Sequence, residues 1–202
     1  MIDPLKEEVR RRGCGRHICP ELGGQGYGQL KLALLNEILG RSQWAPPIVF
    51  GCQAPDTGNA EILAHYGSEQ QKQRYLRPLL DGELFSCYSM TEPHAGADPT
   101  LFTTRAVRDG DDWVINGWKF FSSNAATASF LIVMVVTNPD VSAYQACRCS
   151  WCRRTHRAST SSAMSACMVN PTARGSHALI HYDNVRVPGD ALLGGEGQAF
   201  AI

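Results

Sequence analysis

Hydrophobic residues follow a helical spacing in the first part of the chain. In QLKLALLNEIL (29–39) apolar residues recur every three or four positions, and residues 61–66 continue this spacing as far as Gly67. A glycine at such a point is a common left-handed end of a helix. The sequence SEQQ at 68–71 matches a capping box, which opens another helix through QQKQRYLRPLL until the Asp-Gly pair at 81–82. The pattern therefore predicts helices throughout this part of the chain.

Beyond residue 84 the hydrophobic pattern becomes that of β-strands. VRDGDDWVINGWKFF contains two turn signals, Asp-Gly at 109–110 and Asn-Gly at 116–117, between segments rich in Val, Ile, Trp and Phe. These signals predict consecutive hairpins. SFLIVMVVT (129–137) predicts a buried strand, and HALIHYDNVRVP (177–188) alternates like a further strand that a Pro-Gly pair stops. We therefore predict a helical part followed by a β part.

Composition and charge narrow the class of protein. Hydrophobic residues make up 44% of the chain, and 19 Lys and Arg balance 19 Asp and Glu, so the net charge is zero. Such a chain has no positive field that would attract nucleic acid or an anionic membrane. The longest apolar run, FLIVMVV (130–136), is far shorter than the roughly 20 residues that span a bilayer. We expect a soluble cytoplasmic protein with no signal peptide, no nucleic-acid partner and no membrane partner.

Two motifs carry most of the chemical information. CYSMTEPHAGADPT (87–100) and INGWKFFSS (115–123) resemble two patterns of the middle domain of the acyl-CoA dehydrogenase family. Those patterns are Tyr-x-x-Thr-Glu-Pro-x-x-Gly-Ser-Asp and Asn-Gly-x-Lys-x-Trp-Ile-Thr. Further matches follow in family order, and they are PELGGQGYG (20–28), YGSEQQKQRYLRPLLDGE (66–83) and DNVRVPGDALLGGEGQAF (183–200). GRSQWAPPIVFGCQAPDTGN (40–59) is similar to the branch of the family that animals fuse to a kinase-like domain.

The resemblance implies an α+β fold that is truncated. Residues 1–83 would be the end of the N-terminal α-helical domain, and residues 84–195 the middle β-barrel-like domain. Residues 196–202 would begin a C-terminal helical bundle that is otherwise absent. In the family that bundle supplies the glutamate that removes the α proton, so the resemblance assigns no catalytic residue to this chain. The intact family forms homo-oligomers, and its bundle completes the flavin site across a subunit interface.

The resemblance also implies a reaction and a cofactor. A base removes the α proton of an acyl-CoA thioester while the β hydrogen leaves as hydride to N5 of FAD, which gives a trans-2-enoyl-CoA. The reduced flavin then passes its electrons to an electron-transfer flavoprotein. The protein has to hold the flavin against the acyl chain and to hydrogen-bond its polar edge. The sequence does not indicate the length or branching of the acyl group.

Eight residues take the positions of the family's cofactor contacts. Those along the pyrimidine edge of the flavin are Tyr88, Met90 and Thr91, and those of the second motif are Phe121, Ser122 and Ser123. Phe121 replaces the aromatic residue that packs on the ring system, and Ser123 replaces the hydroxyl residue near N5. Gly96 and Ala97 match the Gly-Ser that approaches flavin and substrate, but Ala97 lacks the hydroxyl, which puts its substrate contact in doubt.

Other readings of the same residues follow from pattern alone. Without the motifs, Tyr88, Trp118 and Phe121 would be read as core or surface aromatics. The histidines have no spacing that suggests a set of metal ligands. Glu92 and Asp98 are interpreted as loop acids and not as a general acid/base pair.

The segment from 146 to 167 departs from the β pattern. It contains four of the eight cysteines, including CRCSWC (147–152), and almost no β-branched or apolar residues. We therefore expect the β domain not to contain it. Back-translation of 151–167 read one base out of frame gives LVPPNTPGIDIERHVSV, which is text typical of this family at this point. The same test on 13–20 gives GLWAPHLP. We interpret 14–19 and 146–167 as frameshifted, through sequencing error or gene decay.

Two alternatives to an acyl-CoA dehydrogenase remain open. Cys147, Cys149 and Cys152, with His156 or Cys167, could form a small zinc-binding module, since four soft ligands within a short segment are chemically adequate. Alternatively, the chain is an inactive, pseudogene-like remnant with at most weak affinity for flavin or acyl-CoA. We expect the chain alone to be inactive, since the resemblance assigns its catalytic base to the absent bundle.

Overall fold

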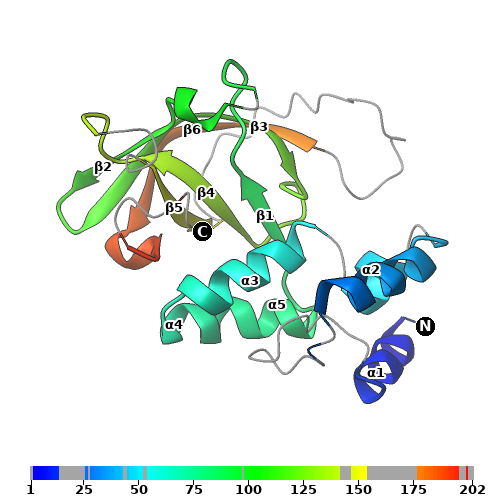
Figure 1. The fold of residues 1–202 in the computed structure, drawn as a ribbon. Helices are drawn as coiled ribbons and strands as arrows, with labels where there is room; N and C mark the ends of the chain where they lie inside the picture. The colour runs from blue at the N-terminus through cyan, green and yellow to red at the C-terminus, as the bar shows by residue number, and fades with distance from the viewer. Residues whose placement is uncertain are drawn as a thin grey trace. The chain divides into compact units, whose positions relative to one another are not determined.

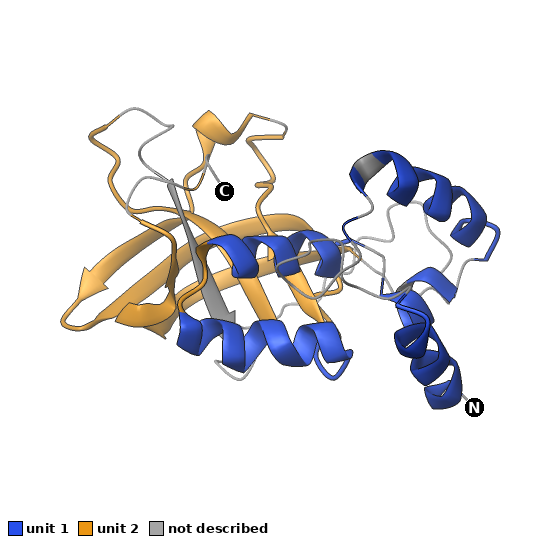
Figure 2. Cartoon of the chain, turned by 60° about the horizontal axis from the view of Figure 1, so that its bottom comes forward, with its two compact units in different colours: residues 1–65, 69–84 blue, residues 66–68, 85–202 orange. Residues whose placement is uncertain are grey.

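The computed structural model consists of two compact units, which are described separately. One comprises residues 1–65 and 69–84, and the other residues 66–68 and 85–202 (Figure 2). For residues 147–153, Gln29 and Pro47 only the backbone is described. The described residues are 2–13, 26, 28–42, 45–51, 54–96, 98–141, 147–153, 177–195 and 199.

The described part of the first unit is helical (Figure 1). The predicted helices over 29–39, 61–66 and 68–81 are confirmed, although the second begins earlier, at Asp56. The last of them changes from α to π and back to α without interruption. The helical elements are α1 (Asp3–Arg11), α2 (Gly28–Leu39), η2 (Pro46–Phe50), α3 (Asp56–Tyr66), α4 (Glu69–Gln71), η3 (Lys72–Leu76) and α5 (Arg77–Asp81).

Helical periodicity and a glycine stop explain the end of this unit. Buried residues occur at 75, 76, 79 and 80, which is the spacing of one face of a helix. Gly82 has a φ of 74°, and its N–H donates to the carbonyl of Leu79 at 3.2 Å. That left-handed conformation is readily available to glycine, so the helix ends where the Asp-Gly pair predicts.

The second unit is built on a curled seven-stranded sheet (Figure 1). The strand order is β6-β3-β2-β4-β5-β7, and β1 pairs with β4 in parallel. The strands are β1 (Ser86–Ser89), β2 (Arg105–Asp109), β3 (Asp112–Ser123), β4 (Phe130–Val136), β5 (Cys147–Arg153), β6 (His177–Pro188) and β7 (Leu192–Leu193). Two short 3-10 turns, η4 (Pro99–Leu101) and η5 (Gly189–Ala191), lie between them.

One of the two predicted hairpins is confirmed and the other is wrong. β2 and β3 pair antiparallel across the Asp-Gly turn, with Asp109 opposite Asp112. The Asn-Gly pair does not form a turn, because it lies inside the 12-residue strand β3. Asn116 instead accepts a hydrogen bond from the N–H of Asn184 on β6 at 2.8 Å, and the register between these strands shifts at this point. Gly117, with a φ of 144°, passes so close to Thr104 that no side chain would fit.

The predicted strands over 129–137 and 177–188 are confirmed as β4 and β6. Every residue of β4 is buried. The expectation that the β domain excludes the segment from 146 is wrong for its first part, because residues 147–153 form β5, paired with β4 along its whole length. The buried strand β4 presents backbone groups that need partners, and an extended neighbour supplies them whatever its side chains are. Residues 154–167 lie outside the described residues.

Two further sequence expectations concern membrane-spanning helices and metal sites. In the part of the chain that the structure describes, no helix has the length and apolarity needed to cross a membrane. Among the described side chains there is also no cluster of three or more His, Cys, Asp or Glu suited to a metal ion. The cysteine side chains of the suggested zinc module are not among the described side chains. The zinc module therefore stays a prediction.

Candidate functional site

The two sequence motifs lie against each other in the second unit. The Phe120 N–H donates to the carbonyl of Thr91 at 2.7 Å, and the Lys119 ammonium donates to the carbonyl of Met90 at 2.7 Å. One residue earlier in the first motif, the hydroxyls of Ser89 and Ser122 are 3.0 Å apart and buried. Residues 89–91 and 119–122 therefore run side by side, held by contacts at three successive positions of the first motif.

A buried ion pair ties the motifs together at the next position. Glu92 and Lys119 are 1% and 0% exposed, and a Glu92 carboxylate oxygen lies 3.0 Å from the Lys119 ammonium. The same carboxylate accepts hydrogen bonds from the backbone N–H groups of Thr103 at 2.8 Å and Thr104 at 2.9 Å, and from the Thr103 hydroxyl at 3.0 Å. Both carboxylate oxygens are thus occupied by donors, as a buried charge requires.

The charge of Glu92 is stabilised by these contacts. Burial alone would raise its pKa, but the hydrogen bonds from Thr103 and Thr104 and the positive charge of Lys119 lower the pKa from 4.5 to about 2. Glu92 is therefore an ionised structural group at neutral pH and not a proton acceptor there. Its interpretation as a loop acid is correct for its place in the chain, but it misses the burial.

A β-bulge turns Phe121 outward. The register between β3 and β6 shifts between Lys119 and Ser122, and within this bulge Phe121 has a φ of 54°. The Phe121 side chain is 44% exposed, although Phe120 and Ser122 beside it are half-buried and buried. A bulge commonly re-aims one side chain next to a binding site. Here it presents an aromatic ring at the surface of the sheet.

Ser123 and His177 lie opposite each other at the end of β3 and the start of β6. The Ser123 hydroxyl and the Nδ1 atom of His177 are 2.7 Å apart, within hydrogen-bonding distance. The His177 ring also meets the Phe121 ring edge to face, with centroids 6.2 Å apart and planes at 84°. His177 therefore contacts both residues of the second motif that sequence reasoning assigns to the flavin ring.

Ser122 differs from its two neighbours because its side chain points into the core. Its hydroxyl meets that of Ser89, which in turn accepts from the Tyr182 hydroxyl at 3.0 Å. All three side chains are at most 1% exposed. A contact between Ser122 and a flavin would have to come from its backbone.

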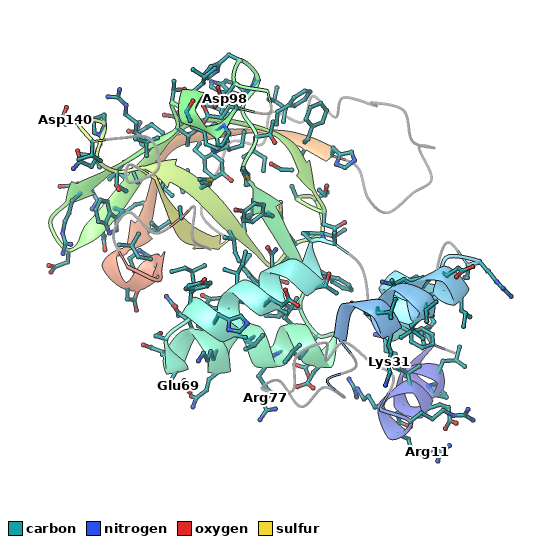
Figure 3. All side chains as sticks on the ribbon, viewed as in Figure 1. Arg11, Lys31, Glu69, Arg77, Asp98 and Asp140 are labelled. Atoms are coloured by element: carbon teal, nitrogen blue, oxygen red, sulfur yellow. The ribbon has the colours of Figure 1, made fainter. Side chains whose placement is uncertain are left out.

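The remaining predicted residues are spread over β1 and the loop that follows it. Tyr88, Met90 and Thr91 are half-buried. Gly96 is exposed with a φ of 55°, and a Cβ placed on it would meet no atom within 4 Å, so the chain is open to an approaching group there. Ala97 lies outside the described residues. Asp98 follows it (Figure 3), and its carboxylate accepts from the Thr100 hydroxyl and N–H, which lower its pKa.

Sequence reasoning missed three residues of this region. The motif pattern assigns no role to Lys119, places Glu92 in a loop, and gives His177 no role. The presence of one acid and one base in two motifs of the same domain is a sequence signal that could have indicated the Glu92–Lys119 ion pair. The position of His177 depends on the register of β6 against β3, which is not readable from the sequence.

Comparison with known proteins identifies the family. The family profile described as "Acyl-CoA dehydrogenase, N-terminal domain" matches residues 6–83, and that described as "Acyl-CoA dehydrogenase, middle domain" matches residues 87–185. The chain belongs to the acyl-CoA dehydrogenase family. Members of this family are flavin-dependent, and both site motifs lie within the match to the middle domain.

Individual relatives agree with this assignment. FadE2 of Mycobacterium tuberculosis, which carries the name of an acyl-CoA dehydrogenase, is 40% identical over 211 residues, covering 100% of this chain and 50% of FadE2. Human acyl-CoA dehydrogenase family member 11 is 38% identical over 207 residues, covering 100% of this chain and 26% of the human protein. A solved structure of an acyl-CoA dehydrogenase homologue from Mycobacterium abscessus superposes with a TM-score of 0.86 at 35% identity, covering 99% of this chain and 50% of the homologue.

The chain thus spans half the length of FadE2 and of the M. abscessus homologue, and about a quarter of the human relative. The matched profiles are those of the N-terminal and middle domains. The fold prediction of a helical part followed by a curled β domain of this family is confirmed. The boundaries at 83, 84 and 195 and the frameshifts at 14–19 and 146–167 stay predictions.

Proposed function

We propose that the protein to which this chain belongs is an FAD-dependent acyl-CoA dehydrogenase. Its reaction is the α,β-dehydrogenation of an acyl-CoA thioester to a trans-2-enoyl-CoA, with an electron-transfer flavoprotein as the electron acceptor. The observation that supports this proposal is that the exposed Phe121 ring and the half-buried Ser123 hydroxyl, which both contact His177, lie on the strand segment that runs beside the first motif. FAD, when bound, supplies the acceptor for the hydride that leaves the β carbon of the substrate.

The described residues fit such a cofactor. Phe121 offers an exposed ring to a planar heteroaromatic system, and the bulge holds it there. Ser123, two residues further along β3, would supply a hydroxyl for a hydrogen bond to a ring nitrogen. Gly96 leaves open space where a side chain would stand. The half-buried residues Tyr88, Met90 and Thr91 would line the pyrimidine edge.

Each group of residues has a separate task in this proposal. Phe121 would stack against the ring system, and Ser123 would hydrogen-bond the atom that receives the hydride. The carbonyls of Met90 and Thr91 are already engaged by Lys119 and Phe120, which fixes the backbone along the edge of the site before any ligand arrives. A preformed site lowers the ordering cost of binding.

The base that removes the α proton is proposed to lie in the part of the relatives that this chain does not span. Glu92, the buried acid nearest to the site, cannot take that role because both of its oxygens accept hydrogen bonds and its pKa is lowered. We further propose that the holoenzyme is a homo-oligomer and that Ala97 lies near the acyl-CoA substrate.

The reaction is tested with the protein extended by the C-terminal part found in its relatives and loaded with FAD. A series of acyl-CoA thioesters is added with an electron-accepting dye, and the products are analysed by mass spectrometry. The proposal predicts dye reduction and a product that has lost two hydrogen atoms. Flavin-loaded protein that reduces no dye with any acyl-CoA would contradict the proposed reaction.

The alternatives are tested with the same extended protein before FAD is added. A folded but colourless protein that takes up no FAD favours the inactive remnant. Stoichiometric zinc in the purified protein, found by elemental analysis, favours the zinc module around Cys147–Cys167.

A further inference from the structure

His177 contacts Phe121 and Ser123 of the second motif but has no role in the proposed function. It starts β6, opposite Ser123 at the end of β3. Its Nδ1 atom is 2.7 Å from the Ser123 hydroxyl, and its ring meets Phe121 edge to face. The His177 side chain thus contacts both residues that the proposed function assigns to the flavin ring.

The Ser123 hydroxyl has one hydrogen to donate and two lone pairs to accept with. If the hydroxyl donated to His177, its hydrogen would be used within the protein. If Nδ1 of His177 carries a hydrogen and donates to Ser123, the hydroxyl hydrogen stays available for an acceptor. In the proposed function that acceptor is N5 of the oxidised flavin.

We propose that His177 is a positioning residue that donates a hydrogen bond from Nδ1 to Ser123 and so directs the Ser123 hydroxyl hydrogen toward the flavin. This inference rests on the proposed function, because it gives Ser123 its target. His177 acts through Ser123 and needs no contact of its own with the ring nitrogen. Its edge contact with Phe121 holds the imidazole plane in place for this task.

Substitutions in the extended protein described above test the proposal, with the dissociation constant for FAD as the first readout. His177→Leu removes the donor, and we expect FAD binding to weaken about three- to tenfold, the usual net effect of losing one hydrogen bond. His177→Asn places an amide group close to the Nδ1 position, so it should restore most of the affinity. The matched control is His181→Leu. His181 lies on the same strand, but its ring stacks on the Trp118 ring with centroids 4.0 Å apart, and the contact with the Ser123 hydroxyl belongs to His177.

A double-mutant cycle separates positioning from general damage to the fold. In a Ser123→Ala background, His177→Leu should cause no further loss of FAD affinity, since its effect is transmitted through the missing hydroxyl. The flavin midpoint potential should become more positive in His177→Leu, because the oxidised flavin loses a donor. Equal losses in the presence and absence of the Ser123 hydroxyl would overturn the proposal.

The direction of the hydrogen bond is measurable without flavin. The ring-nitrogen NMR signals of His177 are assigned by their loss in His177→Asn, and we expect Nδ1 to carry the hydrogen. An Nδ1 without hydrogen would overturn the proposal and leave the proposed function standing. An unsubstituted extended protein that binds no FAD would overturn both. FAD binding that is the same in His177→Leu and His181→Leu would overturn the role of His177 alone.

Discussion

Replacing Lys119 by methionine should strongly destabilise the β unit. The substitution keeps a side chain of similar length but leaves the Glu92 carboxylate buried without its counter-charge. Removing one partner of a buried pair costs about 3–5 kcal/mol of the free energy of unfolding. Glu92 keeps its donors from Thr103 and Thr104, so the lower end of that range, about 3 kcal/mol, is expected.

The lowered pKa of Glu92 predicts how the contribution of its charge to stability depends on pH. A decrease from 4.5 to about 2 corresponds to roughly 3 kcal/mol of preference for the ionised form in the folded state. Because the folded-state pKa lies below the unfolded value, this stabilisation is fully present above the unfolded pKa and is lost as the pH falls toward 2. Glu92→Gln should therefore cost stability at pH 7 and much less near pH 2.

The assay is urea unfolding of the full chain at pH 7, followed by tryptophan fluorescence. With an m-value of about 2 kcal/mol/M, a loss of about 3 kcal/mol lowers the midpoint by about 1.5 M for Lys119→Met. The matched control is Arg186→Met, which removes an ion pair with Asp109 and Asp112 where all three side chains are exposed. The control should leave the midpoint unchanged. A midpoint for Lys119→Met that equals that of Arg186→Met would refute the reasoning.

Two further predictions concern single positions, and a third concerns the gene. Gly117→Ala should destabilise the chain by about 2 kcal/mol or more in thermal unfolding, because a Cβ at this position would lie 2.5 Å from the Thr104 hydroxyl. Gly110→Ala, which also has a positive φ but meets nothing within 4 Å, should cost only about 1 kcal/mol, and equal losses would contradict the steric argument. Tyr182→Phe removes the donor to Ser89 and should cost about 1 kcal/mol in urea unfolding; no loss would show that the hydroxyl cluster is energetically neutral. Resequencing the gene around codons 14–19 and 146–167 should reveal a missing or extra base relative to intact relatives, and unbroken frames would disprove the frameshifts.

Much of the fold is predictable from hydrophobic period and turn residues. The helix at 29–39 follows from apolar residues at helical spacing, although Leu30, Leu34 and Ile38 are exposed. The strands at 129–137 and 177–188 follow from a buried apolar run and from apolar/polar alternation. The Asn-Gly pair at 116–117 could not be interpreted locally, because the strain at Gly117 is set by Thr104 and its register by β6. β5 is not predicted from its own sequence for a related reason, because the backbone of β5 is extended through its pairing with β4.

The candidate site is predictable only in part. The motifs indicate Phe121 and Ser123 through a family resemblance, but they do not show that a bulge exposes Phe121 or that Ser122 turns inward. These outcomes depend on cross-strand register, in which a shift by one residue exchanges the two faces of a strand. His177 is invisible to motif reasoning because its partner is 54 residues away in sequence.

The central claim, that the two motifs contribute to an FAD site, is tested most directly by calorimetric titration of FAD into the purified, FAD-free protein extended by the C-terminal part found in its relatives. The account predicts saturable binding of one FAD per chain that is weakened by Phe121→Ala and by Ser123→Ala and unchanged by Arg186→Met. Absence of binding, or binding that both site substitutions leave unchanged, would contradict it.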